Sequence, residues 1–207
     1  MNNVVVFGGT GEVGRIVVEK LLAQGRIVKT LTRNETSKSS HTNLNLIVGN
    51  VLEVSTVEQC IESQDIVIIT LGFNNSNLDT MSRGTANIVS VMLAKKCNRL
   101  VCLSAQGAGE SWEHMLDSFK TMVLNDPILT ASFKDHTLQE QVVKKSNLNW
   151  TIVRPTEIVN EIESGGYCAN GYKDNLTFRI SKYDVAQFIV DEISNNAYVN
   201  KVVVITN

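Results

Sequence analysis

The chain has 207 residues, of which 43% are hydrophobic, and a formal net charge of −2. This length and this hydrophobic fraction suit one packed globular domain over residues 1–207 and exclude a disordered chain. The near-neutral charge provides no basic surface for a phosphate backbone, so we expect no nucleic-acid partner.

The N-terminus and the cysteines bear on the compartment. A positively charged leader and an apolar run of bilayer length are both missing, so we expect no signal peptide, no membrane contact and a cytoplasmic location. The chain has four cysteines, Cys60, Cys97, Cys102 and Cys168. They form no Cys-x-x-Cys pair and no metal-ligand spacing, which predicts reduced thiols. His41 and His114 have no neighbouring ligand set, so no metal site is expected.

Short β-branched runs alternate with longer stretches of helical period. In chain order, a first strand is expected at residues 4–7, followed by glycines and a helix that presents Val13, Ile16, Val17 and Leu21 on one face. Further strands are expected at residues 27–31, 44–48, 66–69, 100–103, 150–153 and 201–206. Helices are expected at residues 56–62, 80–97 and 132–145, and a last one begins at a capping box over residues 181–184.

The alternation determines the expected fold. Strands separated by helices of this length require right-handed crossovers and a parallel sheet. Nearly continuous Val/Ile runs, such as residues 66–69, are typical of strands covered on both faces. The sequence therefore predicts an α/β fold, a doubly wound parallel-sheet Rossmann fold built as a three-layer α/β/α sandwich.

A glycine pattern follows the first strand directly. Residues 8–14 have the sequence GGTGEVG, which contains Gly-x-Gly-x-x-Gly between a predicted strand and a predicted helix. Glycines permit a tight turn and a close approach to a pyrophosphate, and the helix directs its free N–H groups at the phosphates. The pattern predicts a dinucleotide site; the alternative is a glycine-rich structural turn.

The residue after the second strand distinguishes the two nicotinamide dinucleotides. NAD sites place Asp or Glu there to bind the ribose 2′-hydroxyl. This chain has Arg33, whose guanidinium can pair with the 2′-phosphate of NADP, and Lys38 could assist. NADP(H) is the expected cofactor, and Glu35 keeps NAD open as the alternative.

Further segments extend the pattern along the chain. They are GNV at 49–51, TLG at 70–72, MSRGTANIV at 81–89, LSAQGAG at 103–109, DH at 135–136, LNWTIVRP at 148–155 and ISKYDVAQFI at 180–189. With the glycine turn and Arg33, these segments resemble the atypical short-chain dehydrogenase/reductases, in particular the biliverdin reductase B / flavin reductase group and NmrA-like proteins. Two departures concern the substrate side: Glu157 stands where flavin reductases of this type can have His, and residues 107–131 match poorly.

The resemblance implies a set of site residues. The expected cofactor-binding residues are Gly8, Gly9, Thr10, Gly11, Glu12, Val13, Arg33, Asn50, Val51, Leu71, Gly72, Ser104, Pro155, Thr156 and Ile158. Ser104, at the end of the fifth strand, would lie beside the nicotinamide, and His136 would lie across from it. These two are the candidate catalytic residues; the alternatives are a strand-end cap for Ser104 and a surface group for His136.

The usual short-chain dehydrogenase donates a proton from the phenol of a Tyr-x-x-x-Lys motif. None of the four tyrosines has Lys four residues later, and the corresponding helix position holds His136 followed by Glu140. A carboxylate cannot lower the pKa of a neighbouring acid as an ammonium does. Alcohol and carbonyl chemistry is therefore disfavoured. A conjugated acceptor spreads the charge that hydride transfer brings, so water can supply the proton.

The expected function is that of an NADPH-dependent reductase of a flavin, quinone or tetrapyrrole-like acceptor, acting as a monomer or weak homodimer. Ser104 or His136 could orient the acceptor or relay a proton. Trp112 and Met115, in the poorly matched segment, could floor a pocket for an aromatic substrate or simply pack. The alternatives are an NmrA-like NADP-binding redox sensor without turnover, and a reductase or isomerase of another small metabolite.

Overall fold

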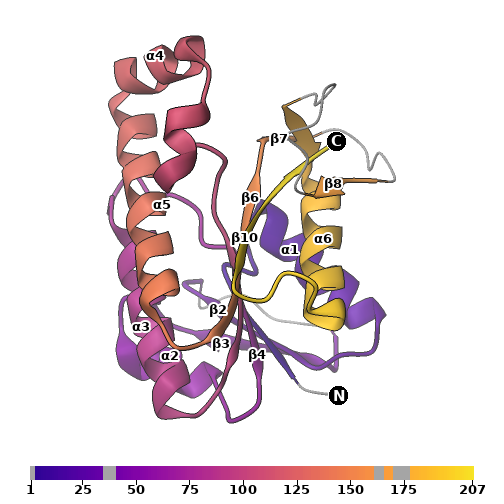
Figure 1. Cartoon of the computed structure of the whole chain (residues 1–207). Helices are drawn as coiled ribbons and strands as arrows, with labels where there is room; N and C mark the ends of the chain where they lie inside the picture. The colour runs from indigo at the N-terminus through magenta and orange to yellow at the C-terminus, as the bar shows by residue number, and fades with distance from the viewer. Residues whose placement is uncertain (1–2, 35–40, 161–165, 170–177) are drawn as a thin grey trace.

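The computed structural model describes residues 3–34, 41–160, 166–169 and 178–207. A sheet with the strand order β3-β2-β1-β4-β5-β6-β10-β8 forms its centre (Figure 1). Its strands are β1 (Val4–Phe7), β2 (Val28–Thr32), β3 (Leu44–Val48), β4 (Ile66–Ile69), β5 (Arg99–Leu103), β6 (Asn149–Pro155), β8 (Cys168–Ala169) and β10 (Lys201–Thr206). β8 pairs antiparallel with β10, and the other neighbours pair in parallel. A separate small sheet pairs β7 (Glu157–Val159) with β9 (Arg179–Ser181).

The strand order reverses direction at β1. The chain first moves outward from β1 to β2 and β3, and then returns to β4 on the other side of β1. In doubly wound sheets such a reversal opens a crevice at the carboxyl ends of the two central strands, where ligands bind. The predicted parallel sheet is confirmed, and its switch point lies beside the glycine turn.

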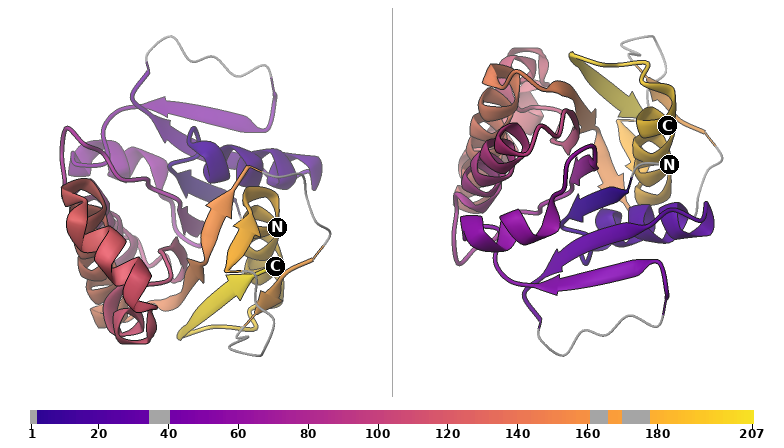
Figure 2. Two further views of the ribbon diagram at one scale, coloured as in Figure 1. Left: turned by 90° about the horizontal axis from the view of Figure 1, so that it is seen from above. Right: turned by 90° about the horizontal axis from the view of Figure 1, so that it is seen from below.

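Helices cover both faces of the sheet. They are α1 (Glu12–Ala23), α2 (Val54–Cys60), α3 (Thr80–Ala94), the 3-10 helix η1 (Gly109–His114), α4 (Asp117–Asn125), α5 (Pro127–Lys145) and α6 (Lys182–Asn195). Figure 2 shows α1 and α6 on one face, and α2, α3 and α5 on the other. The predicted three layers are confirmed.

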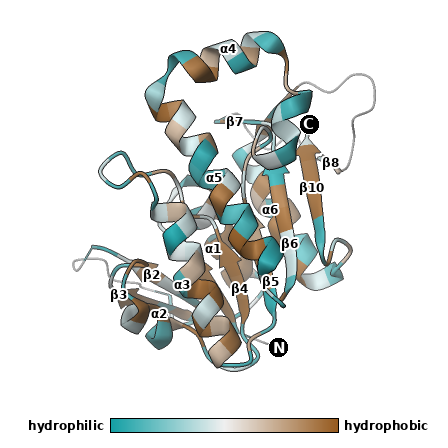
Figure 3. Ribbon diagram, turned by 60° about the vertical axis from the view of Figure 1, so that its left-hand side comes forward, coloured by the Kyte–Doolittle hydropathy of each residue, from teal (hydrophilic) through white to brown (hydrophobic). Residues whose placement is uncertain are grey.

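The continuous apolar runs in the strands supply two cores. In β1, Val4 and Val6 pack with α1 and α6, whereas Val5 and Phe7 pack with α2 and α3. All four side chains are fully buried. Alternate residues of a strand point to opposite faces, so a strand between two helical layers needs apolar residues throughout. Figure 3 shows hydrophobic strands between helices of mixed hydropathy.

The short strands β7, β8 and β9 were not predicted, and two further parts of the fold, around α5, differ from the expectation. α5 begins at Pro127, before the expected residue 132, because Pro127 occupies the first turn and the Asp126 carboxylate accepts from the N–H groups of Ile128 and Leu129. His136 therefore lies in the third turn of α5 instead of its first. The poorly matched segment forms η1 and α4, which were not predicted.

Trp112 in this segment packs with two other rings. Its ring centroid lies 6.5 Å from that of Phe119 and 6.2 Å from that of Phe133. In the part of the chain that the structure describes, no helix combines the length and the apolar character needed to cross a bilayer.

Candidate cofactor and active site

The glycine turn packs so tightly that backbone atoms exclude a side chain from two of its positions, Gly8 and Gly14. Gly8 has a φ of +89°, and a Cβ there would lie 2.4 Å from the carbonyl oxygen of Thr70. A Cβ on Gly14 would lie 2.1 Å from the Gly8 carbonyl oxygen. That oxygen also accepts a hydrogen bond of 2.9 Å from the Gly11 N–H. The turn therefore holds the start of α1 directly against the ends of β1 and β4.

The N-terminus of α1 carries no side-chain cap. Its N-cap is Gly11, which has no side chain to satisfy the N–H groups of the first turn. Thr10, Gly11 and Glu12 are exposed, whereas Val13 is buried. α5 differs, because the Asp126 carboxylate caps it. Uncapped N–H groups at the positive end of a helix fit the pyrophosphate of a dinucleotide.

Arg33 directly follows β2, the strand beside β1. Its side chain is exposed, at the same edge of the sheet as the glycine turn. This is the position from which a guanidinium could reach a 2′-phosphate. The assisting Lys38 and the competing Glu35 lie outside the described residues.

The loops after β3 and β4 complete this part of the crevice. The Asn50 side-chain oxygen accepts a hydrogen bond of 3.0 Å from the Leu52 N–H, which fixes the turn after β3. Val51 is buried. Leu71 and Gly72 follow β4, and a Cβ added at Gly72 would meet nothing within 4 Å. Protein packing therefore does not require a glycine there, whereas a ligand that approaches the backbone closely would.

Ser104 follows β5 and is joined to α5 and β6. Its hydroxyl donates a hydrogen bond of 2.8 Å to Glu140 Oε1. Arg154 in β6 holds the same carboxylate through Nε at 2.7 Å and Nη2 at 2.5 Å. All three residues are buried, with 3%, 1% and 3% of their surfaces exposed respectively. The Ser104 hydroxyl is thus hydrogen-bonded to the carboxylate of a bidentate ion pair between Glu140 and Arg154.

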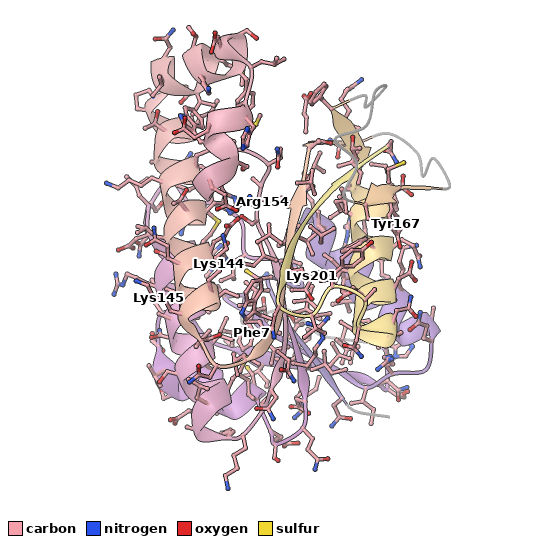
Figure 4. The ribbon with its side chains drawn as sticks, in the orientation of Figure 1. Phe7, Lys144, Lys145, Arg154, Tyr167 and Lys201 are labelled. Carbon is pink, nitrogen blue, oxygen red and sulfur yellow. The ribbon has the colours of Figure 1, made fainter. Side chains whose placement is uncertain are left out.

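Two further charges extend this ion pair toward the surface. Lys144 Nζ lies 3.1 Å from Glu140 Oε2 and 3.1 Å from Glu110 Oε2, and Arg154 Nη1 lies 3.1 Å from Glu110 Oε1. Figure 4 shows Arg154 and Lys144 close together between β6 and α5. We call these four residues the Glu140 cluster: Glu110, Glu140, Lys144 and Arg154.

The cluster keeps Glu140 ionised. Burial alone would raise the pKa of its carboxyl, but the hydrogen bonds and charge of Arg154, with the Ser104 hydroxyl and Lys144, outweigh burial and lower that pKa. Burial would also raise the pKa of Glu110, but its contacts with Arg154 and Lys144 lower that pKa to about 2. Glu140 was recognised from the sequence, but its partner Arg154 was not, because the segment 148–155 gives no indication of a contact with α5.

His136 lies on α5, one turn before Glu140. Burial lowers its pKa, against the opposing effects of its hydrogen bond with Gln139 and of the Asp135 and Glu140 charges, so the ring is neutral at pH 7. Its Nδ1 lies 3.3 Å from Gln139 Oε1. Among the described residues, no hydrogen bond joins His136 to Ser104. Ser104 donates a hydrogen bond to Glu140, whereas Glu140 acts on His136 only through its charge.

Asp135, beside His136, fixes α5 to α3. Its carboxylate accepts hydrogen bonds of 2.9 Å from the Met81 N–H and 3.1 Å from the Ser82 N–H. These are N–H groups of the first turn of α3, which carries no cap from its own N-cap residue. The contact between the start of α3 and α5 therefore depends on the Asp135 carboxylate, a residue of the DH segment to which the sequence alone assigned no role.

The segment after β6 follows the same edge of the sheet. Pro155 is the last residue of β6, and its carbonyl accepts from the Gln106 N–H at 2.9 Å. The Thr156 hydroxyl donates to Thr206 Oγ1 at 3.2 Å, so it contacts β10. Ile158 in β7 is 38% exposed. The expected contact of these residues with a carboxamide stays a prediction.

The NAD(P)H-binding family matches residues 8–196. The chain belongs to this family. The resemblance inferred from the glycine turn is thereby confirmed, and so is a nicotinamide dinucleotide as the cofactor class. The residues present fit such a group, because the uncapped start of α1 and the open space at Gly72 lie along one edge of the sheet.

Three proteins are similar to this chain in sequence or in fold. The photosystem II assembly factor Ycf39 of Trieres chinensis is 26% identical over 158 residues; the match covers 73% of this chain and 44% of that protein. ChuY, an anaerobilin reductase from Escherichia coli O157:H7, superimposes with a TM-score of 0.84 at 18% identity, covering 99% of this chain and 97% of ChuY. A short-chain dehydrogenase/reductase from Veillonella parvula in complex with NADP superimposes with a TM-score of 0.81 at 19% identity, covering 100% and 94%. The two structural similarities show the fold.

Proposed function

We propose that this protein is an NADPH-dependent reductase that transfers hydride to a conjugated acceptor: a flavin, a quinone or a tetrapyrrole-like compound. The bound dinucleotide would supply the hydride from its nicotinamide ring. The uncapped start of α1 would bind the pyrophosphate, and Arg33 would bind the 2′-phosphate. Ser104 would lie at the nicotinamide end of the crevice.

The observation that carries the proposal is the ionised Glu140 where a dehydrogenase motif would supply an ammonium. Glu140 is paired with Arg154 and has no proton to donate at neutral pH. Neutral His136 on the same helix could relay a proton, which is a modest contribution for an acceptor that takes its proton from water. This arrangement suits acceptors whose ring system delocalises the incoming charge.

The tyrosines support the same conclusion. Tyr167 donates a hydrogen bond of 2.9 Å to Asp191, and burial together with this carboxylate raises the pKa of its phenol. Tyr167, Tyr183 and Tyr198 pack against the core on the α1–α6 face of the sheet, and Figure 4 shows Tyr167 on the opposite side of the sheet from Lys144. Tyr172 lies outside the described residues. None of the three described phenols is therefore placed beside Ser104 as a proton donor.

The similarity in fold to ChuY, an anaerobilin reductase, supports the proposed class of acceptor. A tetrapyrrole is an extended conjugated system, as the proposal requires. The same fold similarity includes a Veillonella parvula protein in complex with NADP. Together with Arg33 at the end of β2, this supports NADP over NAD.

One observation favours a second function, that of a redox sensor that binds NADP without turnover. Only 3% of the Ser104 surface is exposed. A reductase must bring the acceptor to the nicotinamide, whereas a sensor needs only the dinucleotide. The burial of Ser104 is what a sensor would show.

Turnover separates the two functions. Purified protein would be mixed with NADPH and, in turn, FMN, menadione and biliverdin, and the loss of the nicotinamide absorbance would be followed. We expect oxidation of NADPH with at least one acceptor, and a reduced rate for Ser104→Ala. Ser194→Ala is the matched control, because Ser194 is exposed near the end of α6. Tight NADP binding without oxidation in the presence of any acceptor would establish the sensor instead.

A further inference from the structure

The direction of one hydrogen bond in the site is determined by its surroundings. Glu140 accepts from four donors: the Ser104 hydroxyl and Arg154 Nε on Oε1, and Arg154 Nη2 and Lys144 Nζ on Oε2. Three of these donors belong to the cationic side chains of Arg154 and Lys144. A carboxylate in such surroundings keeps its charge and has no proton to give. The single hydroxyl proton of Ser104 must therefore point at Glu140.

This direction leaves Ser104 with nothing to donate to a ligand. Its backbone N–H already donates to the Val153 carbonyl at 2.7 Å. Its hydroxyl oxygen retains only lone pairs for other partners. Turning the hydroxyl toward a ligand carbonyl would exchange a bond to a charged acceptor for one to a neutral acceptor, and bonds to charged groups are the stronger ones.

We propose that Glu140 is a positioning residue that fixes Ser104 as a hydrogen-bond acceptor, so that the ligand group that meets Ser104 carries an N–H. This inference rests on the proposed function, in which Ser104 lies at the nicotinamide end of the crevice. Two groups have this chemistry: the carboxamide of the nicotinamide, and an N–H of the acceptor, such as those of tetrapyrrole rings. A quinone offers only carbonyl oxygens, so it is the poorest match among the proposed acceptors.

The first arm of the test measures binding and needs no turnover. Calorimetry would give the Kd of the unaltered protein and of Ser104→Ala for NADP and for its 3-acetylpyridine analogue, in which a methyl ketone replaces the carboxamide. If the carboxamide donates to Ser104, the variant binds NADP about three- to tenfold more weakly, the range of one hydrogen bond, while its Kd for the analogue is unchanged.

The second arm measures turnover. If the acceptor provides the N–H, Ser104→Ala lowers kcat/KM for biliverdin about three- to tenfold relative to kcat/KM for menadione. The two arms distinguish the two sources of the N–H. If the carboxamide provides it, only the ratio of the Kd for NADP to the Kd for the analogue changes. If the acceptor provides it, only the ratio of kcat/KM for biliverdin to kcat/KM for menadione changes. If Ser104→Ala changes neither ratio, the proposal is overturned.

Glu140→Gln tests the positioning itself. The new amide can donate to the Ser104 oxygen, which frees the hydroxyl proton for the ligand. Whichever of the two ratios responds to Ser104→Ala should then change in favour of the ligand that carries only a carbonyl, the analogue or menadione. This change should disappear when Ser104→Ala is also present. The same change in both backgrounds would indicate a merely structural role and would overturn the proposal.

The matched control is Glu192→Gln. Glu192 is also buried, and it accepts from Arg99 Nη2 at 2.7 Å and from the Thr151 hydroxyl at 2.9 Å. Arg99 begins β5, so this second cluster lies at the opposite edge of the sheet. Glu192→Gln should lower stability without altering either ratio. If Glu140→Gln does not fold, the proposal is still overturned by a Ser104→Ala variant that does not discriminate between the paired ligands.

Failure of the proposed function is distinguishable from failure of this inference. If the protein binds NADP but turns over neither acceptor, the proposed reductase function is wrong. The Kd ratio of Ser104→Ala then decides the inference: a selective loss of NADP affinity supports it, and equal effects on NADP and the analogue overturn it.

Discussion

Gly14 lies so close to Gly8 that a Cβ on the former would be 2.1 Å from the carbonyl oxygen of the latter. We expect Gly14→Ala to push α1 away from the turn and to destabilise the protein by about 1–3 kcal/mol, the cost of overpacking. Urea denaturation measures the free energy of unfolding. An unchanged denaturation midpoint would contradict the close contact.

Gly72 provides the complementary substitution. A Cβ there meets no protein atom within 4 Å, so Gly72→Ala should fold with unchanged or slightly higher stability. If the dinucleotide passes close to this backbone, the added methyl group raises the Kd for NADP about tenfold or more, which is 1.4 kcal/mol per factor of ten. Calorimetry measures the Kd, and unaltered affinity would place the dinucleotide elsewhere.

Arg33→Ala tests the preference for the phosphorylated cofactor. Loss of a charge-assisted hydrogen bond of about 1.5–3 kcal/mol predicts roughly 10- to 100-fold weaker binding of NADP, with little effect on NAD. Arg83→Ala is a suitable control, since Arg83 is also exposed but lies on α3. Equal losses for NADP and NAD would remove the preference.

The ion pair of Glu140 with Arg154 should make stability depend on pH. The pKa of Glu140 is lower in the folded chain than its ordinary value, so its pairing stabilises the fold above about pH 4.3 and ceases to do so as the pH falls toward the folded value. Glu140→Gln should therefore cost about 3 kcal/mol at pH 7 and less at pH 3. Urea denaturation at several pH values measures this difference. A difference that does not change with pH would show that Glu140 is not ionised in the folded protein.

Much of the fold could be predicted from local patterns. The strands were predicted because burial on both faces requires nearly continuous apolar runs, as in β4 (Ile66–Ile69). The glycine turn was predicted because its spacing reflects backbone contacts between neighbouring residues, such as Gly11 with Gly8. Both features depend on residues that are close together in the sequence.

The rest depends on contacts between distant segments. Arg154 and Glu140 are buried charges whose pairing follows from the packing of α5 on β6, which no local pattern specifies. Asp135 caps α3 from another helix for the same reason. The start of α5 was different, because Asp126 followed by Pro127 is a recognisable N-cap pattern that the helical periodicity alone did not reveal.

The two buried glutamates have a consequence for the motions of the sheet. Glu140 joins the carboxyl ends of β5 and β6 through Ser104 and Arg154, and Glu192 joins their amino ends through Arg99 and Thr151. Separating these two strands would uncover both ion pairs at once. Their amide protons should therefore exchange with solvent only when the whole molecule unfolds, while the outer strand β3 opens by itself.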